Sequence, residues 1–217
     1  MTPMTPSEDT DRRPEILFDG PEEAPLTLVL AHGAGGPMDS GFMTTVARGV
    51  AGRGFRVARF EFPYMHARRL GAKRGAPDRE PVLRASWLAT IQKLGGGGKL
   101  AIGGKSMGGR IASMVADEAA VRGLVCLGYP FHPPGQPEKL RTAHLAGLRT
   151  QSLIVQGERD PFGTRDDVAD YTLSPAIRIH WIGAGDHSFK PPARSGRTEP
   201  GNLAEAIEAV AQFLEGL

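Results

Sequence analysis

Residues 100–112 read LAIGGKSMGGRIA. The segment opens with residues of strand character, turns at 104–108 and continues with helical spacing. A serine exposed on such a sharp turn has a strained backbone, and side chains two positions before and after it would crowd the turn. Gly104 and Gly108 remove that crowding. The pattern therefore predicts a strand, a tight turn that exposes the Ser106 hydroxyl, and a helix.

Spacing excludes two phosphate-binding motifs that share some of these glycines. A P-loop, G-x-x-x-x-G-K-[ST], would need a glycine where Lys99 stands. A dinucleotide fingerprint that starts at Gly33 would need a glycine where Met38 stands. Neither nucleotide motif is complete.

Strand-like and helix-like segments alternate on both sides of this turn. The expected strands are residues 26–31, 55–62, 100–103, 123–128, 152–157 and 177–182, with an edge strand at 15–18. The expected helices are 42–52, 82–94, 107–120, 137–148, 165–171 and 203–214, and 65–81 and 191–201 are expected loops. This alternation predicts an α/β fold with a mostly parallel sheet of six or more strands and helices on both faces. We expect a flexible tail over 1–14 and a single domain over 15–217.

Composition narrows the function classes. The chain has 217 residues, 40% of them hydrophobic, and a formal net charge of +2. This balance does not indicate a nucleic-acid partner, and no apolar run is long enough to span a membrane. The first fifteen residues lack the apolar core of a secretory signal, so we expect a cytoplasmic protein. Cys126, the sole cysteine, lies in an apolar strand and is expected to be buried and unreactive.

Two further side chains suit the chemistry of an exposed serine. A serine hydroxyl is a weak nucleophile unless a base takes its proton, and a carboxylate must orient that base. Asp160 follows the expected strand 152–157, and His187 follows 177–182. The carboxyl ends of parallel strands meet at one edge of the sheet, where such folds place their sites. We therefore expect Ser106, Asp160 and His187 to form a catalytic triad.

A serine nucleophile also needs donors for the oxyanion that forms during acyl transfer. The backbone N–H of Met107, at the start of the helix, is one candidate. The loop after the first strand, His32-Gly33-Ala34-Gly35, supplies the second, with Ala34 preferred and Gly35 as the fallback.

These residues resemble those of the α/β-hydrolase superfamily from about residue 26 onward, and more closely its small, lid-poor, dienelactone-hydrolase-like branch. The chain is also similar to a hydrolase-like family that includes testis-expressed proteins and a subunit of a chromatin acetyltransferase complex. The segments that carry this resemblance are 32–36, 104–110, 128–134, 179–182 and 186–188. The resemblance implies an α/β-hydrolase fold without a large lid, a triad, hydrolysis through an acyl-enzyme and no cofactor. Few residues precede the first clear strand, so one or two leading strands of the superfamily are expected to be shortened or absent.

Other residues have weaker functional interpretations. Gly35, Tyr64, Met65 and His132 are candidates to line the substrate site, although ordinary packing residues would show the same pattern. Lys105 is expected to be paired structurally at the turn rather than to bind substrate. The histidines lack the spacing of known zinc motifs, so no metal site is predicted.

Two functions fit the sequence. The first is a serine hydrolase of the carboxylesterase type, acting on a small ester, thioester or lactone without a cofactor. The second is a hydrolase-like protein-interaction module with a vestigial triad. The filled catalytic positions favour the enzyme, and the sequence leaves the acyl group and the oligomeric state open.

Overall fold

A computed structural model describes residues 16–73 and 75–217, and within them the chain forms one seven-stranded sheet in the order β1-β3-β2-β4-β5-β6-β7. The strands are β1 Leu17–Asp19, β2 Thr27–Ala31, β3 Arg56–Phe60, β4 Leu100–Lys105, β5 Gly123–Leu127, β6 Ser152–Gly157 and β7 Ile177–Ile182. Only β1, at one edge, pairs antiparallel; the other six strands are parallel. The predicted α/β-hydrolase fold with a mostly parallel sheet is confirmed.

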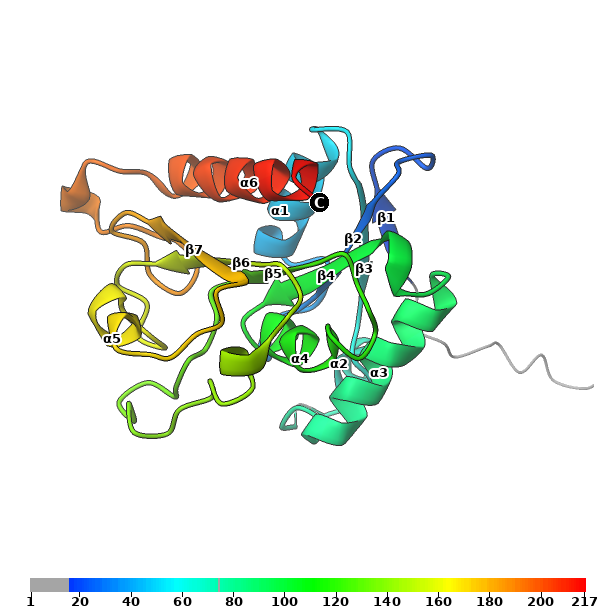
Figure 1. Cartoon of the computed structure of the whole chain (residues 1–217), viewed down its shortest axis with the longest axis horizontal. Coiled ribbons are helices and arrows are strands. Elements are labelled where there is room, and N and C mark those ends of the chain that lie inside the picture. The colour runs from blue at the N-terminus through cyan, green and yellow to red at the C-terminus, as the bar shows by residue number, and fades with distance from the viewer. Residues whose placement is uncertain (1–15, 74) are drawn as a thin grey trace, which may run out of the picture.

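Helices cover both faces of the sheet (Figure 1). They are α1 Gly41–Ala51, α2 Pro63–Arg69, α3 Glu80–Lys93, α4 Met107–Val115, α5 Arg165–Ala169 and α6 Glu199–Glu215, with short 3-10 turns at Gly97–Lys99, Leu145–Gly147 and Ala193–Ser195. The α1 and α6 helices lie side by side on one face, and α3 and α4 pack on the other.

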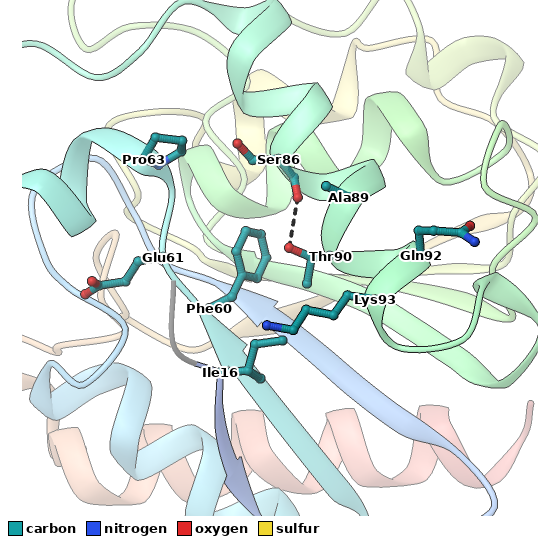
Figure 2. Close-up of a pocket in the computed structure, with 9 residues that line it drawn as sticks. All are labelled: Ile16, Phe60, Glu61, Pro63, Ser86, Ala89, Thr90, Gln92 and Lys93. Carbon is teal, nitrogen blue, oxygen red and sulfur yellow. Dashed lines mark hydrogen bonds between the residues drawn. The ribbon is translucent and has the colours of Figure 1, made fainter. Parts of the chain in front are cut away.

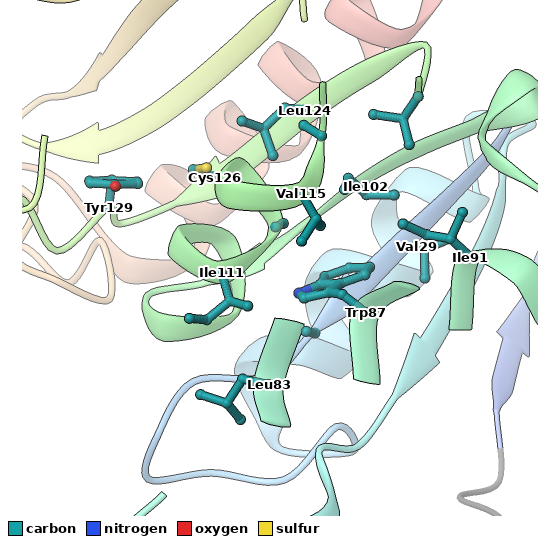
Figure 3. Close-up of a cluster of buried hydrophobic side chains, with 14 of the residues drawn as sticks. Val29, Leu83, Trp87, Ile91, Ile102, Ile111, Val115, Leu124, Cys126 and Tyr129 are labelled. Atoms are coloured by element: carbon teal, nitrogen blue, oxygen red, sulfur yellow. The ribbon is translucent and has the colours of Figure 1, made fainter. Parts of the chain in front are cut away.

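Alternating side chains of each strand build the two cores. Leu28 and Leu30 of β2 belong to the hydrophobic cluster under α1 and α6, whereas Val29 packs in the cluster with α3 and α4. Neighbouring residues of a strand point to opposite faces, so an uninterrupted apolar strand buries both sides. Figure 3 shows Trp87 of α3 and Ile111 of α4 within the second of these clusters. Helices packed on both faces thus hold the strands of the sheet in place.

The segments between the strands differ from prediction in several places. The helix expected at 137–148 is wrong, since only a 3-10 turn at Leu145–Gly147 forms there. The main chain instead bonds to distant groups: Arg141 N–H donates to the Phe131 carbonyl at 2.7 Å, and the Tyr129 hydroxyl donates to the Arg141 carbonyl at 3.0 Å. These partners satisfy backbone groups that a helix would otherwise satisfy.

The expected loop at 65–81 instead begins inside a helix, α2. Proline at the first helical position is compatible with a helix start, and Pro63 holds that place. The Asp78 carboxylate accepts a hydrogen bond from the Tyr64 N–H at 2.9 Å, which satisfies a free donor at the helix N-terminus. Likewise α6 begins at Glu199, within the expected loop 191–201, and α4 ends at Val115, earlier than expected.

The remaining expectations concern the chain ends and membranes. The predicted tail 1–14 lies outside the described residues, as does residue 15 of the expected edge strand, which forms as β1. Among the helices that the structure describes, none is long and apolar enough to cross a membrane.

Candidate active site

Ser106 lies on a strained turn between β4 and α4. Its backbone has φ 50° and ψ −114°, a positive φ that non-glycine residues rarely adopt. The neighbouring glycines allow the turn to pack against β2. A Cβ on Gly104 would lie 2.1 Å from the carbonyl oxygen of Ala31, and one on Gly108 would lie 2.4 Å from the same oxygen. The close approach of backbone to backbone therefore requires glycine at both positions.

The hydroxyl of Ser106 begins a chain of hydrogen bonds. His187 Nε2 lies 2.9 Å from Ser106 Oγ, and His187 Nδ1 lies 2.7 Å from Asp160 Oδ2. Both distances are those of good hydrogen bonds. The structure thus brings together the three residues that the sequence placed after three different strands.

The Asp160 carboxylate is fully buried and accepts several hydrogen bonds. Oδ2, which faces His187, also accepts a hydrogen bond from the Gln156 side-chain amide at 3.0 Å. Oδ1 accepts a hydrogen bond from the Phe162 N–H at 2.9 Å. Donors to both oxygens fix the orientation of the carboxylate. The carboxylate therefore favours the His187 tautomer with the proton on Nδ1, which leaves Nε2 to accept from Ser106.

Burial lowers the pKa of His187, and the nearby positive charge of Lys105 lowers it further, while the bond to Asp160 opposes both effects. The imidazole is consequently neutral at neutral pH. A neutral imidazole can accept the proton of a serine hydroxyl, and an imidazolium cannot.

Lys105 ties the histidine loop to the turn, which agrees with the structural pairing expected from the sequence. Its ammonium donates to the main-chain carbonyl of His187, and burial lowers the pKa of Lys105 to about 8. Gly128, at φ +67°, leaves room for this contact, because a Cβ there would lie 2.8 Å from both Lys105 Nζ and the His187 carbonyl oxygen. The Phe162 ring also packs on the imidazole of His187, with ring centroids 4.2 Å apart.

The loop after β2 borders the same hydroxyl. His32, fully buried, accepts a hydrogen bond from the Phe62 N–H at 3.2 Å and anchors the start of the loop. The Tyr64 hydroxyl donates to the Ala34 carbonyl at 3.1 Å. Both contacts hold the backbone of Gly33 and Ala34 in place beside the turn.

A pocket of about 370 Å³ opens over Ser106. Ala34 and Met107, the residues predicted to donate to an oxyanion, line it together with Ser106. The rest of its wall consists of apolar side chains and four charged ones: Leu83, Ile111, Pro130, Phe162, Asp78, Glu80, Arg110 and Arg141. The sequence assigned no role to the two arginines: Arg110 only closes the segment 104–110, and Arg141 belongs to no motif.

The other residues predicted to line the site do not form this wall. Tyr64 and Met65 are buried behind it in the hydrophobic core, where burial raises the pKa of Tyr64 to about 12. His132 is also buried, with Nδ1 2.9 Å from the Pro133 carbonyl oxygen and Nε2 3.7 Å from Asp167. Gly35 lies in the loop beside Ala34 but does not line the pocket.

A larger cavity, of about 600 Å³, lies away from the triad between β3 and α3 (Figure 2). Phe60 and Ile16 contribute apolar side chains to its lining, and Lys93 lies beside them. The hydroxyls of Ser86 and Thr90 bond to carbonyls of their own helix, at 2.8 Å each. None of the predicted site residues lines this cavity.

The described residues contain no group of three or more His, Cys, Asp or Glu side chains placed to hold a metal ion. Cys126 is buried, and burial raises the pKa of its thiol. A raised pKa keeps the thiol protonated and unreactive, as expected from the sequence.

Residues 24–215 match the family described as alpha/beta hydrolase domain. A lid-less serine hydrolase from Xanthomonas campestris, XC6422, has a TM-score of 0.65 at 20% identity, over 92% of this chain and 88% of that chain. The dienelactone hydrolase from Anabaena variabilis has a TM-score of 0.71 at 19% identity, over 93% and 90%.

A monoacylglycerol lipase from Paleococcus ferrophilus has a TM-score of 0.67 at 13% identity, over 93% of this chain and 99% of that chain. These likenesses show the fold. The narrower resemblance to testis-expressed proteins and the chromatin acetyltransferase subunit stays a prediction.

A phosphoenolpyruvate guanylyltransferase from Frankia casuarinae is 34% identical over 67 residues. The match covers 29% of this chain, which spans only 23% of the length of that curated relative. A match over so small a share of both proteins shows no shared family.

Proposed function

Because this chain belongs to the alpha/beta hydrolase domain family, we propose that it is a serine hydrolase that cleaves a small carboxylic ester, thioester or lactone through an acyl-enzyme on Ser106. The observation that carries the proposal is the unbroken series of hydrogen bonds from Ser106 through His187 to Asp160. A serine, a base and an orienting acid are the minimum set for this nucleophilic mechanism.

Acylation begins when Ser106 Oγ attacks the carbonyl carbon of the substrate. His187 Nε2 takes the hydroxyl proton as the bond forms, and the buried Asp160 carboxylate stabilises the resulting imidazolium. The backbone N–H groups of Met107 and Ala34 donate to the oxyanion, a role supported by the position of both residues in the pocket wall together with Ser106. Collapse of the tetrahedral intermediate passes the proton from His187 to the leaving alcohol or thiol.

Deacylation repeats the same steps with water. His187, neutral again, takes a proton from a water molecule that attacks the acyl-enzyme carbonyl. The same two N–H groups stabilise the second oxyanion, and the proton returns to Ser106 as the carboxylic acid leaves.

The size of the pocket supports a small substrate. A volume of about 370 Å³ lies near the lower end of the range of small-molecule sites. The wall formed by Leu83, Ile111 and Phe162 is apolar and suits a short acyl chain or a lactone ring.

A fluorophosphonate probe tests the proposal, since it forms a covalent adduct only with an activated serine. We expect the wild-type protein to be labelled and Ser106→Ala to resist labelling. Wild-type protein should also hydrolyse p-nitrophenyl acetate. If the wild-type protein neither takes up the probe nor cleaves the ester, the hydrolase proposal fails, and a hydrolase-like interaction module becomes the better description.

A further inference from the structure

The charged side chains of the pocket are unequally paired. Glu80 accepts a hydrogen bond from Arg110 at 3.0 Å, and the Asp78 carboxylate accepts from the Tyr64 N–H at 2.9 Å. Both acids of the pocket thus have a partner. Arg141, in contrast, has no carboxylate within ion-pair distance among the described residues, and no described acceptor bonds its guanidinium.

The position of Arg141 is nevertheless well defined. Its backbone N–H donates to the Phe131 carbonyl at 2.7 Å, and its carbonyl accepts from the Tyr129 hydroxyl at 3.0 Å. Tyr129 and Phe131 are both fully buried. A rigid, core-anchored backbone therefore presents a half-buried guanidinium to the pocket that also contains Ser106.

Arg110 adds a second positive charge to the same wall. It lies one helical turn after Ser106, and its Nε is buried without a hydrogen-bond partner among the described residues. Burial lowers the pKa of Arg141, and the charge of Arg110 lowers it further. The pocket wall thus has two arginines and two carboxylates, but only Arg110 forms an ion pair there, with Glu80, and the Arg141 guanidinium is left without a carboxylate partner among the described residues.

An unpaired, partly desolvated guanidinium costs free energy in the empty protein that a bound anion recovers. Arginine binds the two oxygens of a carboxylate or phosphate in a bidentate manner, which makes it specific for such groups. We propose, on the basis of the proposed hydrolase function, that the substrate carries a carboxylate or phosphate group bound by Arg141 while Ser106 attacks its ester carbonyl. Arg141 would therefore be the residue that determines specificity for anionic substrates.

Three p-nitrophenyl esters of similar length test this inference: the neutral pentanoate, the hemiglutarate with a terminal carboxylate, and the 4-phosphonobutanoate. For wild-type protein, we expect kcat/KM to be about tenfold or more higher for one of the anionic esters than for the pentanoate, the size of one charged hydrogen bond. Whichever anionic ester is preferred identifies the group as carboxylate or phosphate. Equal rates for all three esters, or a preference for the pentanoate, would overturn the inference.

Variants assign the preference to one side chain. Arg141→Gln should bring the ratio of anionic to neutral kcat/KM down to about one, and Arg141→Lys should keep part of the preference because it retains the charge. The matched control is Arg122→Gln, at an exposed position before β5, which should keep the wild-type ratio. A wild-type ratio in Arg141→Gln would contradict the assignment.

The chosen substrates separate this inference from the proposed function. Hydrolysis of all three esters without an anionic preference would refute the role of Arg141 and leave the serine hydrolase intact. Absence of hydrolysis together with absence of fluorophosphonate labelling would refute the hydrolase itself. Circular dichroism of Arg141→Gln checks the fold, which we expect to be unchanged because this guanidinium makes no hydrogen bond to the described residues.

Discussion

The molecule contains two serine–histidine contacts of almost equal length. Ser106 Oγ lies 2.9 Å from His187 Nε2, and Ser113 Oγ lies 2.8 Å from His144 Nε2. The hydrogen bond alone does not distinguish the two pairs. Their surroundings do, because a serine needs more than a neighbouring histidine to become a nucleophile.

The Ser113 pair lacks three features of the Ser106 pair. Ser113 lies within α4 and donates to the Arg110 carbonyl of its own helix at 2.6 Å, an ordinary helical contact. No carboxylate among the described residues bonds to His144, and burial lowers the pKa of this histidine without an acid to orient it. Ser113 is also buried and does not line the pocket. Of the two serines, only Ser106 therefore has a strained backbone, an acid that orients its histidine, and access to substrate.

Replacing each serine in turn should give the largest difference. Ser106→Ala removes the nucleophile, and we expect kcat/KM for p-nitrophenyl acetate to fall by about 10³-fold or more. Ser113→Ala removes a helical contact, and kcat/KM should stay within about threefold of wild type. Similar losses in the two variants would mean that the comparison misidentifies the reactive serine.

Removing the orienting acid should have the next largest effect. Asp160→Asn keeps the shape of the side chain but loses its charge, so the imidazolium is no longer stabilised and the favoured tautomer changes. We expect kcat to fall by about 10³–10⁴-fold. The matched control is Asp170→Asn, at an exposed position after α5, which should retain wild-type kcat. Full activity of Asp160→Asn would show that His187 does not depend on this carboxylate.

The glycine turn should respond to a single methyl group. In Gly104→Ala the Cβ would approach the Ala31 carbonyl oxygen to 2.1 Å in a backbone conformation that alanine avoids. We expect a loss of about 2–3 kcal/mol in the free energy of unfolding, together with reduced activity. Gly98→Ala, at an open surface position, should change that free energy by less than about 0.5 kcal/mol. Urea denaturation measures both, and equal stability of the two variants would rule out the close packing described for the turn.

The pH dependence should show the smallest and most specific effect. Because His187 must be neutral to act as a base and its pKa is lowered, kcat/KM should rise with pH through a midpoint below the ordinary value of 6.5. Lys105→Met removes a positive charge that lowers the pKa of His187, so the midpoint should move to higher pH. Lys99→Met, an exposed control, should leave the midpoint in place. A midpoint that moves to lower pH in Lys105→Met would contradict the electrostatic role of this lysine.

Sequence patterns predicted those parts of the molecule that local rules determine. The glycine spacing around Ser106 fixes a strand–turn–helix, and the order of strands places Asp160 and His187 at one edge of a parallel sheet. These patterns were sufficient to predict the fold and the convergence of the three side chains.

Other features depend on contacts between distant segments and could not be predicted. The segment around Arg141 forms no helix because its backbone bonds to Phe131 and Tyr129 instead. Whether an arginine is paired depends on which carboxylate the fold brings near it. Arg110 forms an ion pair with Glu80 of another helix, whereas Arg141 forms none with an acid among the described residues. Nothing in the local sequence distinguishes the two arginines.

Mapping the fluorophosphonate adduct on wild-type protein tests the central claim most directly. Trypsin cleaves after Lys105 and Arg110, which places Ser106 in the peptide 106–110 and Ser113 in the peptide 111–122. If Ser106 is the nucleophile, we expect a single adduct, in the peptide 106–110. An adduct in the peptide 111–122, or none in either peptide, would contradict this assignment.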